Sequence, residues 1–203
     1  MNEQQVQIIR EARKVVTDIF QTKVNPLFVF HNLEHTIQVV AAAEEIEGYY
    51  QLNDEDKFVL FLSAWFHDTG FSTGHAEEHE KESIKLVQEF LSPRMAEKEI
   101  IIRIASCIRA THMPQEPQNL VEKIICDADL FNLGTNIFSE RNELLRKELQ
   151  AYSKCDFPEE EWRQLNIEFL KAHNYFTGYC RGELEPIKQE WIEKLQNKQG
   201  TMV

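Results

Sequence analysis

The sequence predicts an all-α protein. Apolar residues such as Ile9, Val16 and Ile19 recur at helical spacing, and similar stretches follow along the chain. Helix start and stop signals separate these stretches, whereas the sustained alternation of polar and apolar residues that marks a strand does not occur in the sequence. A chain of 203 residues is long enough for one good-sized core, so we expect residues 1–203 to form a single domain.

Four helices are expected in the first half of the chain. Asn32 is placed to cap the second helix, Asp54 opens the third and Gly70 ends it. A loop that contains glycine and histidine, residues 69–75, leads into the fourth helix, which begins near His79. These helices are expected to cover about residues 3–20, 32–50, 54–68 and 79–91.

Five helices are expected in the second half. Ser92 is expected to be the N-cap of the fifth helix and Pro93 its first helical residue. A capping-box-like sequence starts the sixth at Asn119, and Gly134 stops it. Pro158 begins a long eighth helix. The expected ranges are about residues 92–111, 119–134, 138–152, 158–176 and 186–195.

The charge and the cysteines exclude several classes of protein. The chain has 34 acidic and 22 basic residues, a net charge of −12, which argues against long nucleic acid and anionic membrane as partners because both require basic surface. The four cysteines lie far apart without a C-x-x-C pair, which favours buried thiols in a reducing cytosol. There is no signal-peptide pattern and no apolar run of membrane-spanning length. We therefore expect a cytoplasmic protein.

Side chains that bind metals occur at the ends or inner faces of three expected helices. His67 and Asp68 stand in the last turn of the apolar third helix, where a metal ion would offset the cost of burying the Asp68 charge. His35 lies in the first turn of the second helix. Asp129 shares an apolar face of the sixth helix, whereas Asp127 points elsewhere. Two imidazoles and two carboxylates suit Mn, Fe, Zn or Mg.

Three segments of the chain resemble the motifs of the HD-domain superfamily, which comprises metal-dependent phosphohydrolases with an all-helical fold. They are H-T-I-Q-V-V-A from His35, the pair His67–Asp68, and A-D-L around Asp129. The resemblance spans about residues 27–135 and leaves residues 136–203 as additional C-terminal helices packed on that core. Further segments are similar to a bacterial branch of predicted metal-dependent HD phosphohydrolases: Phe30–Asn32, Phe66–Gly70 and His79–Glu80.

The resemblance implies His35, His67, Asp68 and Asp129 as the ligands of one divalent metal ion. Asp68 would bridge to a second metal where one is present. Two-metal members supply further histidines between the His-Asp pair and the final Asp, and His112 falls in that window. A cap at the end of its helix is the alternative for His112.

The other histidines have separate expectations. His79 is expected to ligate a second metal or to protonate a leaving group, with a plain surface histidine as the alternative. His75 is expected to be a loop residue, and His31 to lie at the mouth of the site or to have a structural role. His173, on an apolar stripe, is expected to be a core histidine with satisfied hydrogen bonds.

Basic residues that would bind a phosphate are few near the motifs. Arg141 and Arg146 are candidates for substrate binding because their helix follows directly on the helix of Asp129. A solvated surface charge is the alternative for each of them.

The expected function is hydrolysis of a small-molecule phosphate ester, in particular a nucleotide or a nucleotide-like compound, with Asp68 and His79 as catalytic residues. One or two metal ions would polarise the phosphoryl oxygen and lower the pKa of a water molecule. Two alternatives remain. Some HD-fold proteins hold two irons for oxygenation, and six residues here would supply that pattern: His35, His67, Asp68, His79, His112 and Asp129. A nucleotide-sensing module without turnover is the other alternative. The substrate, the metal and the oligomeric state stay open.

Overall fold

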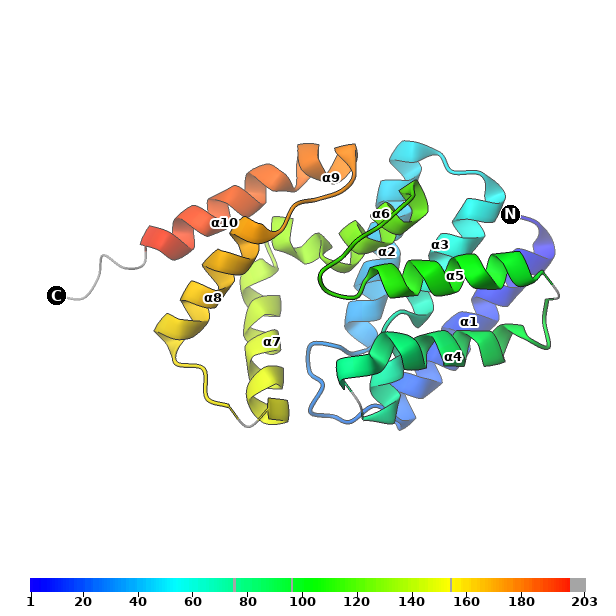
Figure 1. Ribbon diagram of the computed structural model, residues 1–203, viewed down its shortest axis with the longest axis horizontal. Coiled ribbons are helices and arrows are strands. Elements are labelled where there is room, and N and C mark those ends of the chain that lie inside the picture. The colour runs from blue at the N-terminus through cyan, green and yellow to red at the C-terminus, as the bar shows by residue number, and fades with distance from the viewer. Residues whose placement is uncertain (75, 96, 154, 198–203) are drawn as a thin grey trace.

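The computed structural model describes residues 1–74, 76–95, 97–153 and 155–197. Within these residues all regular secondary structure is helical, which confirms the predicted all-α fold (Figure 1). The α-helices are α1 (Glu3–Thr22), α2 (Leu33–Tyr50), α3 (Asp54–Phe66), α4 (His79–Leu91), α5 (Lys98–Ala110), α6 (Leu120–Asp129), α7 (Phe138–Ser153), α8 (Glu159–Ala172), α9 (Gly178–Glu183) and α10 (Glu185–Asn197). Three short 3-10 helices are η1 (Thr69–Thr73), η2 (Ala76–Glu78) and η3 (Phe131–Gly134). Among the described residues, no helix has both the length and the apolar character needed to cross a membrane.

Helix α3 lies at the centre of the N-terminal half. It contacts α1, α2, α5 and α6, so its apolar side chains are enclosed on several sides. Phe58, Leu60, Leu62 and Phe66 are fully buried, as expected of a helix that is apolar around most of its circumference. The end of α3 therefore places His67, the next residue, in the interior.

Helices α7 to α10 lie beside this core (Figure 1). A small second apolar cluster joins η3, α7, α8 and α10 through Leu133, Phe138, Leu170 and Ile192. Residue Leu184, at the end of α9, belongs to the main core and packs against Gly134, where an added Cβ would lie 2.5 Å from the Leu184 side chain. Only glycine permits this close approach between η3 and the C-terminal helices.

The structure corrects two predicted helix boundaries. Ser92 has helical backbone angles and ends α4 instead of starting the next helix, and α5 begins only at Lys98. The backbone N–H groups of Arg94 and Met95 both donate to the Leu91 carbonyl, so the chain turns here before α5. Helix α8 ends at Ala172, not near residue 176, because His173 takes an extended conformation.

Smaller corrections concern the ends of α3 and α6 and one short helix. Helix α3 stops at Phe66, and α6 stops at Asp129, after which η3 carries the chain to Gly134. Helix α9 is not expected from the sequence, because its six residues are too few to show a helical period. The Thr177 side chain caps α9 by accepting a hydrogen bond from the Cys180 N–H group.

Candidate metal centre

Three helices deliver the predicted ligands to one place. Asn32 caps α2 by accepting a hydrogen bond from the His35 N–H group, which fixes His35 in the first turn. His67 ends α3, and Asp129 is the last residue of α6. One ligand atom from each of His35, His67 and Asp129 lies within 4.8 Å of the others. These atoms are close enough for one ion to contact all three residues.

Asp68 completes this group. Its Oδ2 atom lies 3.3 Å from His67 Nε2 and 3.4 Å from His35 Nε2, and Asp129 Oδ1 lies 3.1 Å from His35 Nε2. The Asp68 Oδ2 atom is buried and has no hydrogen-bond partner within the described residues. An unpartnered buried carboxylate oxygen is costly unless a positive charge lies beside it. The arrangement therefore fits a bound cation.

The tautomer of His67 supports the same conclusion. Its Nδ1 donates a hydrogen bond to the Ala64 carbonyl at 2.9 Å, so the neutral ring presents the Nε2 lone pair to Asp68 and Asp129. The Nε2 atoms of His67 and His35 are only 3.4 Å apart. Lone pairs of two imidazoles and two carboxylates repel one another unless a proton or a metal ion lies between them.

The pKa values show how the side chains share charge when a proton takes that place. Burial disfavours a charge on His67, but the Asp68 and Asp129 carboxylates outweigh burial and raise its pKa well above the usual value. Burial also opposes the negative charge of Asp68, but His67 and His79 hold its pKa well below normal. Burial lowers the pKa of His35 despite Asp129. A divalent ion would displace the proton on His67 and bind neutral imidazoles and ionised carboxylates.

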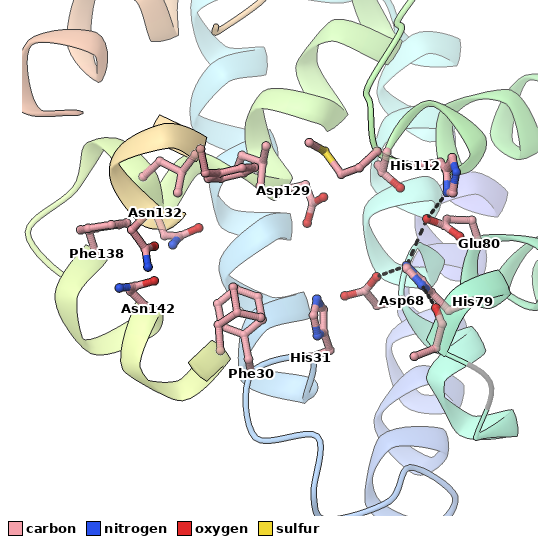
Figure 2. A pocket seen from close by; sticks show the side chains of 18 of the residues that line it. Phe30, His31, Asp68, His79, Glu80, His112, Asp129, Asn132, Phe138 and Asn142 are labelled. Carbon is pink, nitrogen blue, oxygen red and sulfur yellow. Dashed lines mark hydrogen bonds and ion pairs between the residues drawn. The ribbon is translucent and has the colours of Figure 1, made fainter. Parts of the chain in front are cut away.

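A second group of possible ligands lies on the other side of Asp68. His79 Nδ1 donates to the Ala76 carbonyl at 2.8 Å, and His79 Nε2 lies 3.3 Å from Asp68 Oδ1 and 3.5 Å from Glu80 Oε1. His112 Nδ1 lies 3.0 Å from the same Glu80 oxygen, although the His112 side chain is 60% exposed. Asp68 is thus placed between the two groups, as a bridging ligand would be (Figure 2).

Glu80 is a functional candidate that the sequence analysis did not name as a ligand. It is buried, and it connects His79 to the exposed His112. Its position directly after His79 was the available signal, but an acidic residue in the acidic run from Glu77 to Glu80 resembles a solvated charge.

Close packing of the loop after Asp68 positions His79. A Cβ added at Gly70 would overlap with the His79 backbone carbonyl, and the Gly70 N–H group donates to Ser83 Oγ at 2.8 Å. The Phe71 ring stacks on His79 with 4.3 Å between ring centroids. The glycine therefore allows the loop to lie against the start of α4 and to bring His79 beside Asp68.

His31 is held by a residue from a distant helix. Its Nδ1 pairs with Glu148 Oε1, and Glu148 Oε2 accepts hydrogen bonds from the Phe30 and His31 N–H groups at 2.7 and 3.0 Å. Glu148 belongs to α7 and is 3% exposed. The His31 ring also stacks on Phe71 at 4.5 Å. Glu148 thus engages Nδ1 of the ring, and His31 lines the cavity described next.

A cavity of about 320 Å³ extends from the ligands to the C-terminal helices. Asp68, His79 and Asp129 lie at one end, and Asn132, Asn142 and Phe138 at the other (Figure 2). A volume of this size is near the lower end of the range of small-molecule pockets. The cavity therefore suits a small molecule whose reacting group reaches the ligands.

The predicted substrate-binding arginines do not reach this cavity. Arg141 is buried, donates to the Phe30 carbonyl at 2.8 Å and lies over the Phe30 ring. Arg146 donates to the Phe157 carbonyl at 3.1 Å from its Nε atom. Neither side chain lines the cavity among the described residues. Their contacts indicate that they fix the position of α7 and of the segment after it.

The remaining residues from the sequence analysis lie elsewhere. Asp127 accepts hydrogen bonds from the backbone N–H groups of Phe176 and Thr177, both at 2.8 Å, which agrees with the choice of Asp129 over Asp127 as a ligand. His173 Nδ1 lies 3.3 Å from Lys188 Nζ, and burial together with that charge lowers the His173 pKa to about 4. Its buried Nε2 has no hydrogen-bond partner within the described residues, so the prediction of a core histidine with satisfied hydrogen bonds is wrong for this atom. His75 lies outside the described residues. Three of the cysteines are buried as expected, whereas Cys155 is exposed.

Comparison with known proteins gives one match. The family model of the HD domain matches residues 32–133, just over half of the 203-residue chain. The matched segment begins at the cap of α2, ends within η3, and includes His35, His67, Asp68 and Asp129. Neither the curated proteins nor the solved structures gave a match. A match over more than half of the chain shows that this protein belongs to the HD domain family.

Proposed function

We propose that this protein is a metal-dependent phosphohydrolase that acts on a small phosphate ester, namely a nucleotide or a nucleotide-like compound. One observation carries the proposal: four ligand side chains from three helices converge at one end of a cavity of small-molecule size. The HD domain match supports hydrolytic chemistry at this site.

His35, His67, Asp68 and Asp129 would hold the metal ion. Their mixed nitrogen and oxygen donors suit Mn, Fe, Zn or Mg, and thiolates are absent from the group. When bound, the ion polarises the phosphoryl oxygen and lowers the pKa of a water molecule towards neutrality. His79, Glu80 and His112 would hold a second ion, with Asp68 between the two.

The side chains of the protein account for the protons of the reaction. The water oxygen forms a bond to phosphorus while the ester P–O bond breaks, so the water loses a proton and the leaving oxygen gains one. Where no second ion is bound, the pair of His79 Nε2 and Asp68 Oδ1 would accept the proton of the water. His31 is the better-placed donor, because Glu148 engages its Nδ1 and its Nε2 has no partner among the described residues.

The test is metal analysis followed by a screen for phosphate release. The protein is purified, stripped with a chelator and reloaded with Mn, Mg, Fe or Zn, and p-nitrophenyl phosphate, sugar phosphates and nucleotides are offered. We expect phosphate release that requires the metal. A metal-loaded protein that releases no phosphate from any of these compounds contradicts the proposal. Oxygen consumption by the iron form under the same conditions would identify an oxygenase instead.

A further inference from the structure

Asparagine side chains line the cavity away from the metal ligands. Three asparagines from separate elements line it: Asn132 of η3, Asn142 of α7 and Asn166 of α8. Figure 2 shows Asn132 and Asn142 together at the end opposite Asp68 and His79. Neither of these two side chains has a hydrogen bond within the described part of the chain, although both are partly buried. Unpaired amides beside a cavity are available to a ligand.

Asn166 has a fixed orientation. It is buried, and its Nδ2 donates to the Trp162 carbonyl at 2.7 Å. Only the NH₂ group of an asparagine side chain can donate a hydrogen bond, so this contact fixes which end of the amide is the donor. The Oδ1 atom is then free to accept a hydrogen bond from a ligand. The three asparagines together offer amide donors and acceptors at one end of the pocket.

Apolar side chains surround these amides. Leu133, Phe138, Leu145 and Phe169, which come from the same elements η3, α7 and α8, also line the cavity. Flat apolar walls with a few polar groups suit a planar ring system that carries hydrogen-bonding edges. They do not suit a sugar phosphate alone, because its hydroxyl groups would be buried against apolar walls without partners.

The charges at the cavity limit the number of phosphates. No lysine or arginine lines it within residues 1–74, 76–95, 97–153 and 155–197, whereas Glu77 and Glu80 line its ligand end. A metal ion would neutralise one phosphate group there. Further phosphates would find no lysine or arginine in the described lining to compensate their charge, which disfavours di- and triphosphates.

We infer that the substrate is a nucleoside monophosphate, whose single phosphate ester lies at the metal ligands and whose base lies between the asparagines and the apolar side chains of η3, α7 and α8. This inference rests on the proposed function. It assigns substrate selection to residues beyond the matched segment, apart from Asn132 and Leu133. The phosphate and the base thus occupy opposite ends of one cavity.

The experiment compares substrates with and without a base. The Mn-loaded full chain is given the four nucleoside 5′-monophosphates, the corresponding triphosphates, ribose 5-phosphate and p-nitrophenyl phosphate. At least one monophosphate should be hydrolysed with kcat/KM about tenfold or more above that of ribose 5-phosphate and of its own triphosphate. The variants Asn142→Ala and Asn132→Ala should each lower the ratio of kcat/KM for that monophosphate to kcat/KM for ribose 5-phosphate by roughly tenfold. Asn174→Ala, at an exposed asparagine away from the cavity, is the matched control and should keep the ratio.

Binding of the same compounds, measured by calorimetry, distinguishes failure of this inference from failure of the proposed function. Metal-dependent hydrolysis of p-nitrophenyl phosphate with no preference for nucleoside monophosphates, or a preference that both asparagine variants retain, overturns this inference and leaves the proposed function standing. Binding of a monophosphate that weakens in the asparagine variants, without phosphate release from any compound, overturns the proposed function and retains the specificity. If the chain neither binds nor hydrolyses any of these compounds, both are overturned.

Discussion

The Nε2 atoms of His35 and His67 face one another at 3.4 Å, although the two residues are 32 positions apart in the chain. Each ring comes from the end of a different helix, and the carboxylates of Asp68 and Asp129 close the group. Two ring nitrogens at this distance can share one positive charge, a proton in the metal-free protein or the metal ion that we propose for this site. Five predictions test the metal site, its protons and the residues that position them.

The first prediction concerns Asp68. The wild-type protein should gain stability from metal as RT ln(1 + [L]/Kd), about 2.7 kcal/mol at a hundredfold excess over Kd. Asp68→Ala removes a ligand, so its thermal melt should lose most of this gain, and its hydrolytic activity should disappear. Asp18→Ala, at an exposed position on α1, is the control and should melt as wild type does. A variant without Asp68 that keeps both metal stabilisation and turnover would show that Asp68 is not a ligand.

The second prediction concerns the number of metal ions. If His79 and Glu80 hold a second ion with Asp68, then His79→Ala and Glu80→Ala should each halve the metal content measured by elemental analysis. His112→Ala should have a weaker effect, because the side chain is largely exposed and contacts Glu80 from outside. Metal content equal to wild type in all three variants would favour a site for a single ion.

The third prediction concerns pH. The folded protein keeps a proton on His67, whose pKa is raised well above the usual value, while the unfolded chain loses it near pH 6.5. The metal-free protein should therefore become less stable as pH rises above 6.5, by about 1.4 kcal/mol for each pH unit across which only the folded state holds the proton. His79, whose pKa is also raised, acts in the same direction.

Metal should reverse this trend, because fewer protons compete for His67 as pH rises and binding becomes tighter. Urea denaturation between pH 6.5 and 9, with chelator and with Mn, measures both effects. Stability of the metal-free protein that stays constant over this range would contradict the assignment of the proton to His67.

The fourth prediction concerns His31 and Glu148. His31→Gln should lower kcat by roughly a hundredfold or more without changing the metal content, because it removes a proton donor and not a ligand. Glu148→Gln should have a smaller effect on kcat, since an amide oxygen can still accept hydrogen bonds from the Phe30 and His31 N–H groups while the ion pair with His31 Nδ1 is lost. An equal loss of metal in His31→Gln would instead assign His31 to the metal site.

A stability prediction tests how the loop positions His79. Gly70→Ala forces an overlap with the His79 backbone, so it should destabilise the fold and weaken binding of the second ion together. Gly48→Ala is the matched control, because Gly48 lies within α2 with nothing near its added Cβ. It should stabilise the protein by up to about 1 kcal/mol. Thermal melts and metal titrations of the two variants provide the comparison.

The sequence predicted those parts of the site that depend on local structure. Asn32 caps α2 as expected, and the end of α3 places His67 in the interior, because caps and apolar periodicity act over a few residues. The prediction for Ser92 was wrong. A serine before a proline is typical of a helix N-cap, whereas in the structure Ser92 is the C-cap of α4.

The sequence did not predict contacts between distant segments. Glu148 and His31 are 117 positions apart, and no local pattern indicates that they pair. For the same reason Arg141 appeared as a free charge near the site, whereas it lies buried against Phe30, 111 positions away. A side chain's partner in a distant helix follows from the packing of the whole chain, so single-sequence patterns cannot supply it.

The contacts of Glu148 with Phe30 and His31 connect two parts of the cavity wall that lie on different helices. The metal ligands stand on α2, α3 and α6, whereas much of the far wall of the cavity stands on α7 and α8, and Glu148 joins the two parts. Substitutions on α7 and α8 can therefore change the molecule that is accepted while the ligands stay intact. On the proposed function, a chimaera that replaces the side chains of α7 and α8 that line the cavity, with Glu148 retained, would alter selectivity and leave the metal ligands unchanged.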